Sequence, residues 1–207
     1  RLNTGGTELS DQEIRNCTSR MTGHRGVKFY EFLRDCSQNI DYQACIESLP
    51  DSSGDKLVNE ELVLRFLCLK NARERFKKNV RDWLDDYMEA IIFEHAEFDF
   101  EKEKAAFCRL FAFLNRVMGS ASFVRFRDGR PVGALAPAHF EAVSLGVWSN
   151  LDALEKVNDA LVKNQIIEIV TSETFLMNVG PGSNSLAKFN GRIDAVDQGL
   201  HACTDGN

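Results

Sequence analysis

Proline is scarce in this chain, with 4 among 207 residues, and long apolar runs are missing. The apolar runs that occur are short, as in Ala90–Phe93, whereas a membrane-spanning helix needs about 20 apolar residues. Hydrophobic residues make up 43% of the chain and charged residues 27%, which is an ordinary globular balance. These features exclude collagen-like, disordered and membrane-spanning classes. They predict either one sizeable core or a helical domain with the tail of a neighbour.

Metal-binding cysteine pairs are also missing. None of the six cysteines belongs to a Cys-x-x-Cys pair, and none of the four histidines is spaced like a zinc ligand beside a cysteine. Several cysteines lie on apolar stripes, as in Leu67–Leu69, and we expect no signal peptide. We therefore predict free, buried thiols in a reducing cytosol and no metal site. The cysteines are Cys17, Cys36, Cys45, Cys68, Cys108 and Cys203.

Motifs of self-sufficient catalysis are not found. The chain has no Walker-type phosphate loop, no Gly-x-Gly-x-x-Gly after a strand and no His-Glu-x-x-His. Adjacent carboxylates such as Asp85 and Asp86 are typical of a solvated helix face, and no motif ties a histidine to a serine or cysteine nucleophile. We predict no catalytic residue and no cofactor within this chain.

The net charge is -6 and the sequence pI is about 5.3. An acidic surface repels nucleic acid, so any DNA contact requires a local basic patch. In one dense basic stretch a single acid, Glu74, stands among five basic residues. This stretch is either a solvated helix end or a phosphate-contact patch for DNA. Its basic residues are Arg73, Arg75, Lys77, Lys78 and Arg81.

Apolar residues recur at helical spacing along most of the chain, which predicts a mainly all-α fold of roughly eight to ten helices. Ser10 and Glu13 form a capping box that starts the first helix. Gly119 is expected to end the helix before it. Loops are predicted at 50–55 and 180–185, an extended piece over 120–126 and a turn at 128–131. Helices are expected over 11–20, 27–38, 42–48, 60–69, 78–96, 100–118, 137–148, 152–163 and 186–203.

The segment 60–69 is apolar nearly all round, which predicts the central buried helix. Asn59 is its expected N-cap, and Glu60 and Glu61 suit the positive end of the helix dipole. Arg65 is the single basic residue inside it. Its side chain either reaches the surface or is buried and held by a carboxylate.

Two glycine turns could bind an anion. Asn3–Gly6 and Gly180–Ser185 can each expose successive backbone amides, the second at a helix N-terminus. A tight turn followed by a helix cap is the alternative explanation for both.

The N-terminal residues Arg1–Asn16, Arg-Leu-Asn-Thr-Gly-Gly-Thr-x-Leu-Ser-x-Gln-Glu-Ile-Arg-Asn, resemble the second signature of the ParB/sulfiredoxin-like domain of GmrS-type restriction proteins. Further segments are similar to the region that lies C-terminal to this signature in that family, so the resemblance spans most of the chain. These segments are 60–67, 83–88, 140–144, 182–185 and 192–193.

The resemblance implies that residues 1–20 end a truncated ParB-like α+β domain and that 21–207 form a helical domain. Such proteins defend bacteria against phage or foreign DNA. Their ParB-like domain is associated with nucleotide hydrolysis, here of GTP or ATP, and some members pair with an HNH nuclease. This sequence contains neither the family's Asp-Gly-Gln-Gln-Arg type signature nor an HNH segment. We therefore expect a C-terminal helical part, in the bacterial cytoplasm, that relays DNA sensing to the missing domain.

Residue roles carry over from the family only within the first motif. Its arginine and asparagine would lie at the edge of the nucleotide pocket, and its two glycines would form the turn that lets backbone approach it. Two charged residues would lock the following helix to that turn. The alternative is that all six fix a junction between two domains. They are Arg1, Asn3, Gly5 and Gly6 for nucleotide binding, and Glu13 and Arg15 for the junction.

Two other functions stay open. The chain could be a non-catalytic helical interaction module that forms a homo-oligomer or recruits a nuclease, with its Phe-rich stripes in the interface. It could also contact DNA through residues 73–81.

Overall fold

The computed structural model describes residues 9–49, 57–77 and 79–205, with side chains up to residue 202. The described residues form ten α-helices, two short 3-10 helices and one two-stranded sheet, which confirms the predicted mainly all-α class. None of the described helices is long and apolar enough to cross a membrane. The loop predicted at 50–55 and the glycine turn at 3–6 lie outside the described residues.

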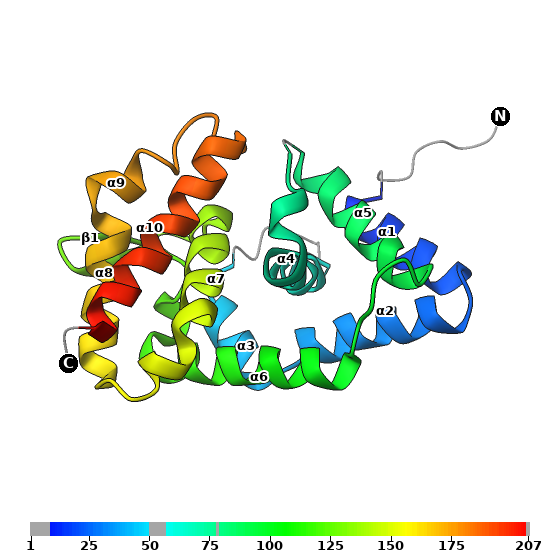
Figure 1. The fold of residues 1–207 in the computed structure, drawn as a ribbon, viewed down its shortest axis with the longest axis horizontal. Coiled ribbons are helices and arrows are strands. Elements are labelled where there is room, and N and C mark those ends of the chain that lie inside the picture. The colour runs from blue at the N-terminus through cyan, green and yellow to red at the C-terminus, as the bar shows by residue number, and fades with distance from the viewer. Residues whose placement is uncertain (1–8, 50–56, 78, 206–207) are drawn as a thin grey trace.

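Helix α4 (Val58–Ala72) lies at the centre of the molecule (Figure 1). The consecutive residues Leu62, Val63 and Leu64 are all buried, so the helix is covered on every side, as its composition predicted. It packs against α1, α2, α5 and α7. The neighbouring N-terminal elements are α1 (Asp11–Met21), α2 (His24–Ser37), α3 (Ile40–Ile46), the 3-10 turn η1 (Arg73–Arg75) and α5 (Val80–Ile92).

Helices α7 (Pro137–Leu154) and α10 (Leu186–Asp205) form the most extensive contact between two elements (Figure 1). Gly146 permits this close approach, because a Cβ built on it would lie 2.6 Å from Cγ1 of Val196. Helices α8 (Asp159–Thr171) and α9 (Glu173–Leu176) also pack on α10. Helix α6 (Phe100–Val117) connects the N-terminal helices to the C-terminal helices, since it packs against α2 and α3 as well as α7 and α8.

A 3-10 turn and a hairpin connect α6 to α7. They are η2 (Gly119–Ala121) and the antiparallel strands β1 (Arg125–Arg127) and β2 (Arg130–Val132). Asp128 and Gly129 have φ angles of 51° and 71°, as a tight hairpin turn requires at both positions. The extended piece predicted over 120–126 is wrong in its first half, because the chain leaves Gly119, at a φ of 54°, in a 3-10 turn.

Several predicted helix boundaries are wrong: α2 begins at His24 instead of residue 27, and α5 ends at Ile92 instead of residue 96. Asn59 was predicted to be the N-cap of α4 but lies inside the helix. The N-cap residue is Leu57, whose side chain forms no capping hydrogen bond. Helix α7 continues through Asp152, where a new helix was predicted to begin. The next helix starts only after Asn158, because the Asn158 side chain accepts a hydrogen bond from the second amide of α8 at 2.9 Å.

Aromatic and aliphatic side chains fill the core, and the apolar stripes predicted on α5 and α6 are buried there. Five cysteines are free thiols in the part of the chain that the structure describes. Cys36, Cys45 and Cys68 are buried, and burial raises the pKa of Cys45 to about 12. Cys17, which we predicted to be buried, is exposed because it lies on the outer face of α1.

Candidate functional site

The nucleotide-binding residues that the resemblance implies, Arg1, Asn3, Gly5 and Gly6, lie outside the described residues. Glu13 belongs to the capping box. Its carboxylate accepts from the Ser10 amide at 2.7 Å, and its own amide donates to the Ser10 hydroxyl at 3.3 Å. Glu13 therefore fixes the start of α1.

Arg15 lies on the inner face of α1 and is 3% exposed. Its guanidinium forms ion pairs with Glu61 of α4, at 3.1 Å, and with Asp85 of α5, at 2.6 Å. The neighbouring Asn16 donates to Glu60 at 2.6 Å. Because these partners come from two other helices, Arg15 holds the first described helix to the central one.

The basic residues of 73–81 do not form one free positive surface. Arg73 forms an ion pair with Asp194 of α10 at 2.6 Å. Arg81 is paired with Asp11 at 3.2 Å and with Asp85 at 3.8 Å. Of the other members, Arg75 and Lys77 are exposed, with Glu74 3.7 Å from Arg75, and Lys78 lies outside the described residues. Three of the described cations in this stretch, Arg73, Arg75 and Arg81, are thus already paired with carboxylates.

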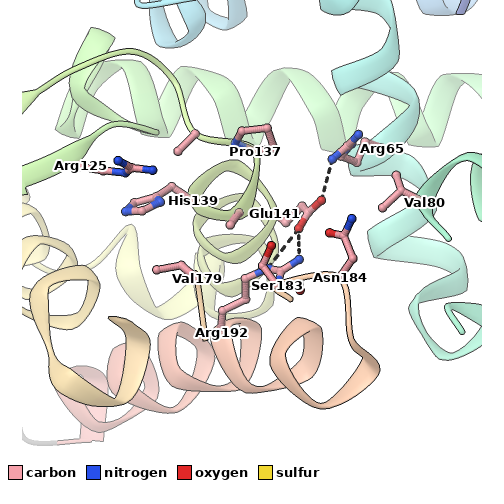
Figure 2. Close-up of a pocket in the computed structure, with 12 residues that line it drawn as sticks. Arg65, Val80, Arg125, Pro137, His139, Glu141, Val179, Ser183, Asn184 and Arg192 are labelled. Atoms are coloured by element: carbon pink, nitrogen blue, oxygen red, sulfur yellow. Dashed lines mark hydrogen bonds and ion pairs between the residues drawn. The ribbon is translucent and has the colours of Figure 1, made fainter. Parts of the chain in front are cut away.

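A polar pocket of about 390 Å³ lies where α4, the start of α7 and the approach to α10 meet the β-hairpin. Figure 2 shows its charged side chains converging from these separate elements. Three arginines and one glutamate line it together with a histidine, so positive charge is in excess. The polar lining residues are Arg65, Arg125, His139, Glu141, Ser183, Asn184 and Arg192.

Glu141 is the centre of a buried ion triad at the base of this pocket (Figure 2). It accepts from Arg65 of α4 at 2.7 Å and from Nε of Arg192 at 3.1 Å. Glu141 is 2% exposed and Arg192 is 1% exposed. Buried charges are tolerated only when they are paired and hydrogen-bonded. The triad therefore fixes α4, α7 and α10 relative to one another.

The triad satisfies Arg192 but leaves other donors and acceptors of the pocket free. Arg192 also donates to the Ser183 carbonyl, at 2.5 Å, and so holds the loop before α10. The guanidinium of Arg125 is exposed and forms no ion pair or hydrogen bond with a described residue. Nε of Arg65 and Nδ1 of His139 are buried and have no hydrogen-bond partner within the described structure. Buried polar atoms without a hydrogen-bond partner are rare in folded proteins.

His139 is 3% exposed and packs edge-on against Phe175, with ring centres 5.0 Å apart. Burial, followed by the charges of Arg125 and Arg192, lowers the pKa of His139 to about 4. Its imidazole is therefore neutral at neutral pH. A neutral imidazole beside unpaired arginine nitrogens can accept a proton from an incoming acid or share one with it.

Sequence reasoning identified parts of this pocket but not the whole. It flagged the loop 180–185 as a possible anion site and left open a buried Arg65 held by a carboxylate. The structure shows Arg65 held by Glu141, with 12% of the Arg65 side chain exposed. His139 and Arg125 were missed, because no motif surrounds them, and Glu141 was quoted only within the segment 140–144 without a role. Four segments quoted for the family resemblance meet here, through Arg65, Glu141, the Ser183–Asn184 pair and Arg192.

No protein-family model, curated protein or solved structure matches this chain. The residues that the structure describes also contain no group of three or more His, Cys, Asp or Glu side chains placed to hold a metal ion. The function is therefore inferred from the pocket itself.

Proposed function

We propose that this chain is a helical binding module whose α4–α7–α10 pocket takes a small anionic ligand. One observation carries the proposal. Arg125 stands unpaired at a pocket whose wall contains two further arginines, Arg192 paired with Glu141 and Arg65 shared between Glu141 and Glu61. An anion placed there would pair with Arg125.

The size and composition of the pocket also favour a small ligand. Its volume of about 390 Å³ falls in the range of small-molecule sites, which combine apolar walls with a few placed polar groups. Here Val80, Pro137 and Val179 supply the apolar part. Ser183 and His139 both line the pocket, but no hydrogen bond joins them in the described structure, so binding rather than catalysis is the activity we assign to it.

The setting of this module is the second part of the proposal. Because Arg1–Asn16 resembles GmrS-type restriction proteins, we place the chain as the helical part of such a bacterial defence protein. Its partner there would be a ParB-like domain that hydrolyses GTP or ATP. Phosphate release from both nucleotides, with and without DNA, tests this setting. It should be seen only in a longer form of the protein that carries the ParB-like domain, and its absence there would refute the setting without touching the pocket.

The binding function is tested by thermal unfolding of the chain in sodium phosphate, sulfate, citrate and chloride at matched ionic strength. A ligand that binds the folded state raises the unfolding temperature, by an amount that grows with the logarithm of its concentration relative to Kd. We expect at least one multivalent anion to raise it above the chloride value, and the Arg125→Ala variant to lose that increment. Equal temperatures in all four salts, or an equal increment in Arg125→Ala, would rule out the pocket as an anion site.

A further inference from the structure

Helix α1 has its polar side buried and its apolar side exposed. The residues that it buries are Gln12, Arg15 and Ser19. On its outer side Ile14, Cys17 and Met21 follow one another at intervals of three and four positions, so they form one apolar stripe along the helix. Ile14 is 42% exposed, Met21 is 85% exposed and Cys17 is also exposed. A helix of a globular protein ordinarily turns its apolar side to the core, so this outer stripe lacks a cover among the described residues.

The buried polar side of α1 fixes the helix in this orientation. Arg15 forms ion pairs with Glu61 of α4 and with Asp85 of α5, and the Ser19 hydroxyl donates to Sδ of Met88 at 3.3 Å. A rotation that buried the outer stripe would break these contacts and expose their partners. The stripe can therefore be covered only by something that packs on α1 from outside.

Two charged residues beside the outer stripe indicate that a second copy of the chain is the cover. Glu13 and Arg20 are seven positions apart, so they lie on the same flank of the stripe. Neither forms an ion pair with a described residue, although the Arg20 guanidinium lies 5.4 Å from the centre of the Tyr30 ring. When two identical helices pack antiparallel, the same flanks face each other and run in opposite directions. Glu13 of each copy then meets Arg20 of the other.

The apolar residues fit the same two-fold arrangement. An antiparallel pair places Ile14 against Met21 of the second copy, and Cys17, in the middle of the stripe, comes next to the symmetry axis. A parallel pair would instead set Glu13 against Glu13 and Arg20 against Arg20. Charge complementarity therefore favours the antiparallel pair over the parallel one.

We infer that α1 is a homodimer surface, on which two copies of the chain pack their outer stripes antiparallel. The interface is formed by a helix of 11 residues, so the association is weak and reversible. This inference is independent of the proposed anion pocket, which lies beside α7 and α10 on the opposite side of α4 from α1 (Figure 1).

Sedimentation equilibrium in reducing buffer tests the inference, over protein concentrations from about 10 μM to 1 mM. The mean mass should rise from monomer to dimer across this range. Met21→Glu should weaken the dimer by at least about tenfold, because it places a charge in an apolar contact. Leu161→Glu is the matched control, since Leu161 is an apolar residue of α8 that is 53% exposed, and it should dimerise like wild type.

The charged flank has its own test. Arg20→Glu should weaken the dimer by at least about threefold, because it sets two carboxylates against each other at each end of the interface. Adding Glu13→Gln should restore part of the loss. Glutamine removes one of the two like charges but can still form the capping box with Ser10.

Cross-linking tests the antiparallel orientation. In a Cys17→Ser background, Ile14→Cys and Met21→Cys are prepared separately and treated with a short bismaleimide, alone and mixed. The mixture should give far more cross-linked dimer than either variant alone, whereas a parallel pair would give the reverse. Cys17→Ser without a further change measures the background from the other cysteines.

Three results would overturn the inference. The first is a monomer over the whole concentration range. The second is a dimer that Met21→Glu leaves unchanged, because that dimer uses another surface. The third is a longer form of the protein, with the ParB-like domain, that stays monomeric and shields Cys17 from maleimide, because that domain would then be what covers α1. Each of these leaves the anion pocket untouched.

Discussion

At the scale of single residues, Glu141 and His139 are buried polar groups of the pocket whose charge states are fixed in different ways. Glu141 stays charged because two arginines hold it, whereas His139 stays neutral because burial and two nearby cations disfavour its protonated form. Glu141 stabilises the fold only as long as its arginine partners remain. His139 makes the free energy of unfolding depend on pH.

His139 should lower the stability of the protein in mild acid. In the unfolded chain it takes up a proton near pH 6.5, but in the folded protein only near pH 4. Between these values the unfolded state binds more protons, so the free energy of unfolding falls as the pH falls through this window. The full loss, reached below pH 4, is about 3 kcal/mol. Urea unfolding of wild type and His139→Gln between pH 7 and 4.5 should show a smaller loss in the variant, whereas the exposed His24→Gln should behave like wild type.

Replacing Glu141 by glutamine should be among the most destabilising single changes in the chain. The variant keeps the shape of the side chain but leaves the buried Arg192 without its carboxylate and Arg65 with Glu61 alone, and breaking a buried pair costs about 3–5 kcal/mol. Glu155→Gln is the control, because its ion pair with Arg109 lies near the surface and is expected to contribute less than about 1 kcal/mol. Urea unfolding at pH 7 measures both. Similar losses in the two variants would contradict the energetic importance of the triad.

At the scale of helices, Gly146 determines how closely α10 can approach α7. A Cβ there would lie 2.6 Å from Val196 Cγ1 and 3.1 Å from the Asp197 amide. We expect Gly146→Ala to destabilise the protein by about 1–3 kcal/mol, the usual cost of overpacking. Gly180→Ala, where a Cβ would meet no atom within 4 Å, should have little effect. Thermal unfolding compares them, and adding Val196→Ala to Gly146→Ala should recover part of the loss unless the clash with the backbone dominates.

The same scale shows what could be predicted from the sequence. Helical periodicity predicted most elements and identified α4 as the central helix. A helix that is buried on all sides is apolar on all its faces, and this can be read from its own sequence. The capping box of Ser10 and Glu13 was equally local. The pocket could not be predicted in this way. Arg65 and Glu141 are 76 positions apart, and Glu141 and Arg192 are 51 apart, so only the packing of three helices brings them together.

At the scale of the whole molecule, ion pairs link the pocket to the first helix. Arg65 lies 2.7 Å from Glu141 and 2.8 Å from Glu61. Glu61 in turn lies 3.1 Å from Arg15 of α1, and Arg15 lies 2.6 Å from Asp85 of α5. In Figure 1, α10 and α1 lie on opposite sides of α4, and this chain of charges passes through α4 between them.

This arrangement predicts that Glu141 and Arg15 are energetically coupled although they share no contact. Arg65 divides its guanidinium between Glu141 and Glu61, and the second oxygen of Glu61 serves Arg15. Once Glu141 is replaced by glutamine, Arg65 depends on Glu61 alone and draws that carboxylate away from Arg15. Arg15→Gln should then cost less in the Glu141→Gln background than in wild type, by at least about 0.5 kcal/mol.

A double-mutant cycle in urea unfolding measures this coupling. The control cycle combines Glu141→Gln with Arg109→Gln, because Arg109 pairs with Asp152 and Glu155 outside this network and should be additive within about 0.3 kcal/mol. Additivity in both cycles would mean that each ion pair acts alone. Coupling in the first cycle only would mean that a change at the pocket alters how firmly α1 is held, and therefore that a ligand bound beside Glu141 can be sensed at the N-terminal helix.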